Sequence, residues 1–168
     1  MTLQDLQTLV DYHYWARDRL LAALEPLTSE QYARDLGNSF RSIRETVTHI
    51  YAAEWAWYQR WKGESPTALL PADRFPDLAA LRAEWSEQER KLRAYVNGLG
   101  DGGVSRIVEY KLLSGQAGAS PVSQMVQHVV NHASYHRGQI TTMLRQIGAE
   151  PAKPMDLIAY YRVHSAAR

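Results

Sequence analysis

The sequence predicts an all-α protein, a four-helix bundle, and three observations point to this fold. Apolar residues recur at alternating spacings of three and four along four segments of about 20 residues, as in amphipathic helices. A proline or glycine follows each segment, at Pro26, Gly63, Gly98 and Gly148. Each segment has one apolar face, and four such helices bury these faces by packing together. The length of 168 residues fits a single domain spanning residues 1–168.

The first helix is predicted over residues 2–25, with Thr2 as N-cap and Asp5 in the capping-box position. Its apolar stripe also contains His13 and Arg17, so both are expected to point toward the core. The second helix is predicted over residues 42–62. Ser42 and Glu45 form an S-x-x-E capping box there, and glycine at 63 suits the left-handed cap that ends a helix.

The third helix is predicted over residues 77–97, after a loop at 63–76 that contains three prolines. Residues 104–113 are short and rich in β-formers, so they are expected to be an extended segment or a small hairpin, and 114–120 a loop.

The fourth helix is predicted over residues 121–147, with Ser120 as N-cap and Pro121 at the first helical position. A short tail at 156–162 is expected to add one or two turns. The connections between the four helices are long, so crossovers are possible and the spacing alone leaves the topology open.

Composition excludes several classes of function. Lysine and arginine total 19 against 18 acidic residues, so the basic excess typical of nucleic-acid-binding domains is missing. No run of 18 apolar residues predicts a membrane span. Because the chain has no cysteine, it has no disulfide, no cysteine-ligated zinc and no cysteine nucleophile. The first residues, MTLQD, do not resemble a signal peptide, and we expect a cytoplasmic protein.

The chemically informative residues are three histidines in the fourth helix, His128, His132 and His136. Neighbours four apart lie one turn, or about 6 Å, along a helix, so two of them can share one metal ion. His128 and His136 are about 12 Å apart and cannot share one. A helical wheel places His132 and His136 toward the core and His128 at its border.

A third ligand must come from another helix, and His49 and His13 are the candidates. Ala52 and Ala53 follow His49 by one turn and would leave room for an ion. The competing interpretation is a structural bundle with a histidine-rich core. Burying two imidazoles without a partner is costly, however, and a metal ion would supply the partner.

Several motifs together resemble the DinB/YfiT-like family of metal-binding bundle proteins. The most specific is NHASYHRGQI at Asn131–Ile140; weaker ones are YWAR at Tyr14–Arg17, SFRSI at Ser39–Ile43 followed by THI, and DLIAY at Asp156–Tyr160. The resemblance implies an up-down-down-up four-helix bundle that is often homodimeric. It also implies one divalent metal ion held by three histidines, which match His49, His132 and His136, and so selects His49 over His13.

Three neutral imidazoles leave at least one coordination position open, which is the arrangement of a catalytic site rather than a structural one. A bound water would have a lowered pKa, or a thiolate could displace it. Zinc and nickel both suit imidazole ligands. Because only neutral imidazole binds a metal, affinity is expected to fall below pH of about 6.5.

Other polar residues are predicted to lie near the site. Glu54 lies on the inner stripe of the second helix and is the candidate for orienting a histidine or moving a proton; an ion pair with Arg17 is the alternative. Arg137 is expected to pair with a carboxylate or to bind an anionic substrate. Tyr135 and Gln139 are expected to take part in ordinary packing.

The predicted function is therefore that of a metal-dependent enzyme acting on a small molecule. Relatives in the wider superfamily that the resemblance indicates include transferases that use thiols such as bacillithiol or mycothiol, and a hydrolase fits the same open site. The alternative is a non-catalytic, stress-related metal- or ligand-binding protein.

Overall fold

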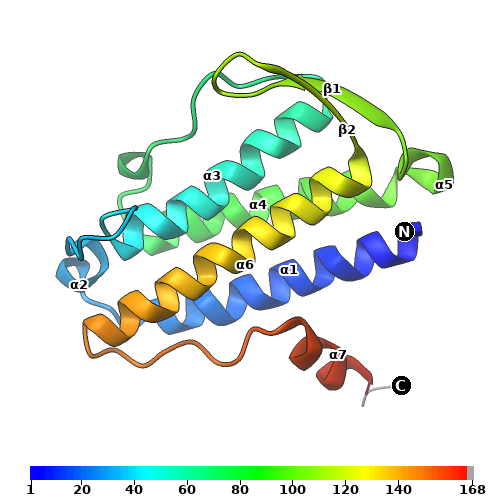
Figure 1. Ribbon diagram of the computed structural model, residues 1–168. Coiled ribbons are helices and arrows are strands. Elements are labelled where there is room, and N and C mark those ends of the chain that lie inside the picture. Colours follow the sequence, from blue (N-terminus) through cyan, green and yellow to red (C-terminus); the bar gives the residue numbers. More distant parts are fainter. Residues whose placement is uncertain (166–168) are drawn as a thin grey trace.

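The computed structural model describes residues 1–165, without the side chains of Asp101 and Ser165, and four long helices dominate it (Figure 1). These helices are α1 (Leu3–Leu24), α3 (Ile43–Trp61), α4 (Leu78–Asn97) and α6 (Val122–Gln146). Each begins and ends within one residue of its predicted bounds, because the apolar period and the caps mark helix ends in the sequence itself. The prediction of a mainly helical protein is confirmed.

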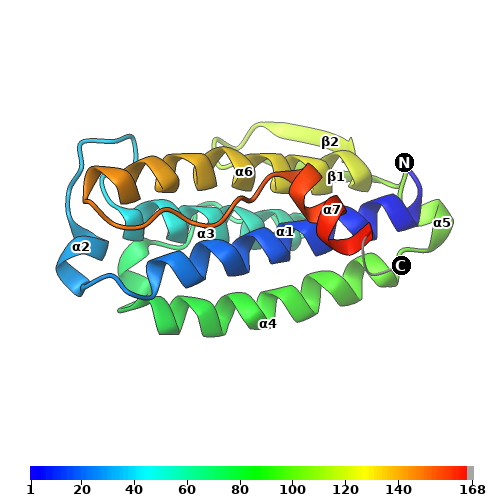
Figure 2. The ribbon, with the colours of Figure 1, turned by 90° about the horizontal axis from the view of Figure 1, so that it is seen from below.

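The four long helices lie side by side around one core. α1 and α6 run in one direction and α3 and α4 in the other (Figures 1 and 2). α3 packs against α6 and α4, while α1 packs against α4 and α6. Each long helix contributes fully buried side chains to this core, among them Leu6, Ile43, Trp85 and Ile140. Because α3 and α4 are parallel, the segment between them must run back along the bundle, which explains its length.

Both predicted capping boxes begin helices, but only one is complete. At α1, Thr2 Oγ1 accepts from the Asp5 amide and the Asp5 carboxylate accepts from the Thr2 amide at 2.8 Å. At α3, Ser42 Oγ accepts from the Glu45 amide, whereas the Glu45 carboxylate accepts from the Arg41 amide at 2.9 Å. An N-cap of this kind stabilises a helix by about 1 kcal/mol.

A β-hairpin lies across one end of the helices, and it corrects two predictions. Strand β1 (Ile107–Lys111) pairs antiparallel with β2 (Ala117–Pro121), so most of the segment predicted as a loop at 114–120 is strand. Ser120 does not cap α6, since its hydroxyl lies 3.2 Å from the hydroxyl of Tyr110 across the hairpin, and Pro121 is the residue at the N-cap position. The strand Ala-Gly-Ala-Ser-Pro lacks β-formers, so pairing with β1 determines its structure.

Three short elements lie in the connections between the predicted helices, and one element extends a prediction. The short ones are α2 (Ser29–Ala33), the 3₁₀ turn η1 (Ala72–Arg74) and α5 (Gly100–Gly103). They are too brief to show a helical period. The predicted tail helix is present as α7 (Leu157–Ser165), which packs against α1.

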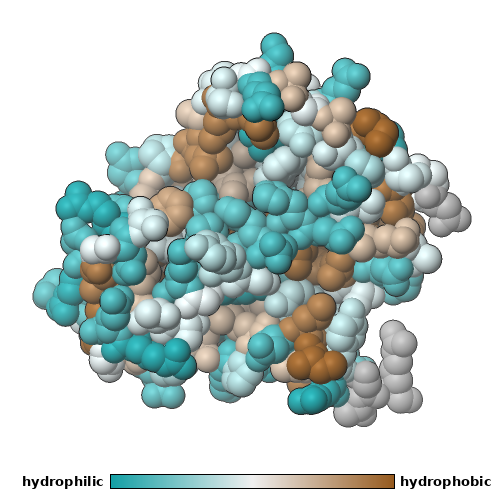
Figure 3. Space-filling view, viewed as in Figure 1, coloured by the Kyte–Doolittle hydropathy of each residue, from teal (hydrophilic) through white to brown (hydrophobic). Residues whose placement is uncertain are grey.

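The surface is mostly hydrophilic on the face that carries α6 (Figure 3). An exception is α7, where Ile158, Tyr161 and Val163 are exposed and where Figure 3 shows an apolar patch. Within residues 1–165, no helix combines the length and apolar character that crossing a bilayer requires.

Candidate metal centre

Three histidines from two antiparallel helices meet between α3 and α6. His132 Nε2 lies 3.2 Å from His49 Nε2 and 3.1 Å from His136 Nε2. All three ligand nitrogens lie within 4.8 Å of one another. Tetrahedral zinc with bonds of 2.0–2.1 Å would place its ligand nitrogens about 3.3 Å apart. The spacing therefore fits a single ion.

Helix geometry explains why these side chains converge. His132 and His136 are one turn apart on α6, so their rings project from one face. On α3, Ala52 and Ala53 are buried beside His49, and their small side chains let α6 approach closely. His13, the other candidate for a third ligand, points into a different part of the core.

Without an ion, the three histidine rings cannot all form good hydrogen bonds with one another. A neutral imidazole carries one N–H, so His132 Nε2 can donate to only one of the two nitrogens that face it, or share its proton between them. Metal coordination removes this conflict, because three lone pairs can then point at one cation.

Gln139 sets the orientation of His136. Its Oε1 lies 2.7 Å from His136 Nδ1 and accepts the proton there, which leaves the Nε2 lone pair free to face the other histidines. The prediction of ordinary packing for Gln139 is therefore wrong. The spacing i, i+3 to a candidate ligand could have indicated this role.

Replacing Gln139 with leucine should weaken zinc binding by about 10–100-fold, the usual effect of losing such a supporting group. Gln139→Glu retains an acceptor and should bind zinc at least as tightly as the wild type. Competition with a chromogenic chelator measures both. Equal affinities for the leucine variant and the wild type would contradict the role given to this residue.

Burial keeps two of the histidines neutral. Desolvation, helped by the nearby His136, lowers the pKa of His49 from 6.5 to about 4. Desolvation, followed by the charges of His136 and His49, lowers the pKa of His132 to about 3. Both imidazoles are thus neutral at neutral pH, as metal binding requires.

These lowered pKa values change the expected pH dependence of metal binding. At pH 5.5, the protonated form of an imidazole with the ordinary pKa outnumbers the neutral form about tenfold. His49 and His132, by contrast, remain neutral at this pH. Protonation of His49 or His132 should therefore not weaken zinc binding by the folded protein between pH 7.5 and 5.5, and should weaken it steeply only near pH 4. Zinc titrations monitored by calorimetry at these pH values check this, and a hundredfold loss at pH 5.5 would contradict it.

The same shifts imply that the metal-free protein loses stability in acid. Below about pH 6.5, His49 and His132 bind protons in the unfolded chain but not in the folded chain. The free energy of unfolding therefore falls as the pH drops from about 6.5 toward about 4.

Aromatic rings surround the three histidines. Phe40 stacks on His49 at a centroid distance of 4.1 Å and contacts His136 at 5.4 Å. Phe40 and His49 also line a cavity of about 580 Å³ between α3 and the segment around η1. Tyr135 is 67% exposed with its ring 5.1 Å from His136, so its predicted packing role is wrong.

His128 lies beside the histidines but does not belong to the group that could hold an ion. Its exposed ring is 5.7 Å from that of His132 and 5.0 Å from that of Trp57. Trp57 in turn contacts Tyr110 of the hairpin at 5.1 Å and lies 4.6 Å from the guanidinium of Arg60. Burial, followed by the charge of Arg60, lowers the pKa of His128.

Glu54 is the centre of a second polar cluster. Its carboxylate is 1% exposed and accepts three hydrogen bonds, from His13 Nε2 at 2.8 Å, the Tyr14 hydroxyl at 2.8 Å and Trp85 Nε1 at 2.7 Å. Burial and the charge of Glu54 raise the pKa of Tyr14 well above its usual value, which keeps that hydroxyl a donor. These partners come from α1 and α4, whereas the three histidines lie between α3 and α6.

Two predicted ion pairs are replaced by other contacts. Arg17 pairs with Asp18 at 2.7 Å and with Glu89 at 2.6 Å, so the alternative pairing with Glu54 is wrong. Arg137 is buried, and none of the carboxylates that the structure describes lies within salt-bridge distance of it. It donates instead to the hydroxyls of Ser134 at 2.7 Å and Tyr12 at 3.2 Å. The predicted carboxylate partner of Arg137 is therefore also wrong.

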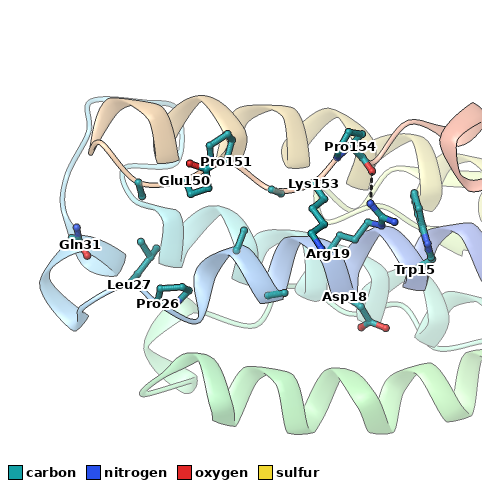
Figure 4. A pocket seen from close by; sticks show the side chains of 14 residues that line it. Trp15, Asp18, Arg19, Pro26, Leu27, Gln31, Glu150, Pro151, Lys153 and Pro154 are labelled. Atoms are coloured by element: carbon teal, nitrogen blue, oxygen red, sulfur yellow. Dashed lines mark hydrogen bonds between the residues drawn. The ribbon is translucent and has the colours of Figure 1, made fainter.

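A larger cavity of about 990 Å³ lies elsewhere, between α1 and the segment that links α6 to α7 (Figure 4). Trp15, Asp18 and Lys153 line it, and Arg19 donates to the Pro154 carbonyl across it at 3.2 Å. None of the three histidines lines this cavity, and it holds no comparable convergence of ligand atoms.

The fold and the site together define a class: a helical protein with a three-histidine group between two antiparallel helices. The comparison with known proteins then gives the family. The model of the DinB family matches residues 1–165, and the chain belongs to that family. Protein DinB of Bacillus subtilis (strain 168) is 30% identical over 158 residues, covering 90% of this chain and 91% of the relative.

Proposed function

We propose that His49, His132 and His136 bind one divalent ion, zinc or nickel, and that the protein is a metal-dependent enzyme. The supporting observation is the meeting of three imidazole nitrogens within 4.8 Å, with no fourth ligand from residues 1–165 in the group. Such an open shell suits a small-molecule transferase that uses a thiol, or a hydrolase. This activity would belong to a cytoplasmic homodimer with an up-down-down-up four-helix bundle in each copy.

When bound, the ion would act as a Lewis acid that lowers the pKa of a water or thiol in the open position. The surrounding residues prepare the site for this. His49 and His132 are held neutral by burial, and Gln139 fixes the ring of His136. Phe40 shields two of the rings from water. The three ligands carry no negative charge, so a site with a divalent ion would attract an anion such as a thiolate.

A thiol would have to come from outside, because the chain has no cysteine. A low-molecular-weight thiol is therefore the proposed co-substrate. A homodimer contact would bury Ile158, Tyr161 and Val163, the exposed apolar residues of α7.

One observation favours the alternative of a metal- or ligand-binding protein without turnover. Glu54, the proposed proton carrier, has all three of its hydrogen-bond partners away from the three histidines. A catalytic role for Glu54 stays a prediction, and the contacts favour a structural role.

The experiment starts from untagged protein analysed for bound metals. Zinc- and nickel-loaded samples are then assayed with cysteine, glutathione or bacillithiol and the electrophile 1-chloro-2,4-dinitrobenzene. We expect transfer that is lost on chelation and in His132→Ala. Bound metal with no thiol-dependent or hydrolytic turnover would favour the non-catalytic alternative, and absence of metal binding would contradict both.

A further inference from the structure

Arg60, near the end of α3, has two terminal guanidinium nitrogens that bind no described side chain or carbonyl of the chain. Its side chain is 4% exposed, its Nε donates to the Lys111 carbonyl at 3.1 Å, and its guanidinium lies over the Trp57 ring. Among the side chains that the structure describes, which do not include that of Asp101, no carboxylate lies within salt-bridge distance of the two terminal nitrogens. Burying a charge without a counter-charge is costly, so a buried and unpaired guanidinium is a candidate for binding an anionic ligand.

A terminal nitrogen of each of the other two buried arginines has partners within the chain, although Arg137 too has no carboxylate partner among them. Arg17 is paired with two carboxylates, and a terminal nitrogen of Arg137 donates to two hydroxyls. The bond to Lys111 and the ring contacts explain how Arg60 anchors the hairpin to α3. They do not explain why a guanidinium, with its terminal donors unused, occupies this position.

Arg60 also lies at the end of a continuous path from the three histidines. His132 contacts His128, His128 contacts Trp57, and Trp57 contacts Arg60. Along α3, Arg60 is eleven residues beyond His49, a rise of about 16 Å. Helical side chains lean toward the N-terminus, so the guanidinium is displaced back toward the histidines.

We propose that Arg60 binds a carboxylate of the small thiol whose sulfur binds at the metal centre. The proposal rests on the proposed function and narrows its substrate class to extended, carboxylate-bearing thiols, about the size of a short peptide. A charge-assisted, bidentate contact with a guanidinium is the geometry by which arginine recognises a carboxylate.

The test uses Co²⁺-loaded protein, in which thiolate binding produces a charge-transfer absorption band. Glutathione is titrated against its diethyl ester, which keeps the thiol and removes both carboxylate charges. The wild type should prefer glutathione on the order of tenfold. Arg60→Gln, which retains an N–H donor for Lys111, should lose the preference, and Arg60→Lys should keep part of it. The control is Arg106→Gln, because Arg106 donates to Tyr95 near the same end of the fold, and it should behave as the wild type.

A second measurement needs no variant. In zinc-loaded wild-type protein, the ¹⁵N resonance of Arg60 Nε should shift on addition of glutathione and not of its diester. An unchanged preference in a folded Arg60→Gln variant, or an unmoved resonance, would overturn the role of Arg60 alone. Equal binding of acid and ester by the wild type would do the same. If no thiol alters the cobalt spectrum, thiol binding at the metal centre fails too.

Discussion

Chelation is expected to lower the melting temperature of the protein by roughly 5–10 °C, and zinc or nickel should restore it. An ion that binds only the folded chain stabilises it by about 2.7 kcal/mol at a hundredfold excess over the dissociation constant. For a chain of this size each kcal/mol shifts the melting temperature by about 2–4 °C. Calorimetric melts of untagged protein with and without EDTA measure the effect.

Alanine at His49, His132 or His136 should abolish this metal-dependent shift, because each removes one of the three converging nitrogens. His128→Ala is the matched control. It removes an imidazole one turn from His132 whose ring contacts Trp57, and it should retain the full shift.

Two results would contradict this arrangement. If His128→Ala loses the shift while His49→Ala keeps it, the third ligand is His128 and not His49. If the wild type melts identically with and without chelator and binds no divalent ion at pH 7.5, the three histidines are core residues that share hydrogen bonds.

Most of the fold could be predicted from local patterns in the sequence. The four long helices have an apolar period and capping residues that do not depend on distant contacts, and their bounds were predicted to within one residue. Strand β2 has no such signal, because Ala117–Pro121 becomes a strand only by pairing with β1. Ser120 before Pro121 has the pattern of a helix cap, yet its hydroxyl meets Tyr110 instead.

The candidate site was predictable to the extent that it depends on one helix. The spacing of His132 and His136 placed two nitrogens together, whereas the choice of His49 needed the family resemblance. The contact between Gln139 and His136 could have been predicted from the same kind of spacing. The contacts of Arg60 could not, because its surroundings depend on where the hairpin crosses α3.

For Glu54, the sequence predicted the burial of the side chain but not its hydrogen-bond partners. Its place on an inner helix face was correctly inferred, since the residue is 1% exposed. Which neighbours it would meet depends on the relative rotation and offset of α1, α3 and α4. Arg17 and His13 lie on the same stripe of α1. The packing of the helices places His13, rather than Arg17, against the Glu54 carboxylate, with Tyr14 and Trp85 as further donors.

Replacing Glu54 with alanine is expected to destabilise the protein by about 3–5 kcal/mol, because it leaves buried donors of His13, Tyr14 and Trp85 without an acceptor. Glu54→Gln keeps one acceptor oxygen and should cost about 1–3 kcal/mol. Urea unfolding measures both, and Glu30→Gln at an exposed pair should change stability by less than about 0.5 kcal/mol.

The glutamine variant also separates a structural role for Glu54 from a catalytic one. Because the carboxylate contacts none of the three clustered histidines, folded Glu54→Gln should bind zinc as the wild type does and retain its thiol-dependent turnover. A catalytic carboxylate would give the opposite result, with near-normal stability and a large loss of turnover. In that case Glu54 would have to reach the metal centre through a rearrangement of α1 and α3, and its three buried hydrogen bonds would describe only a resting state.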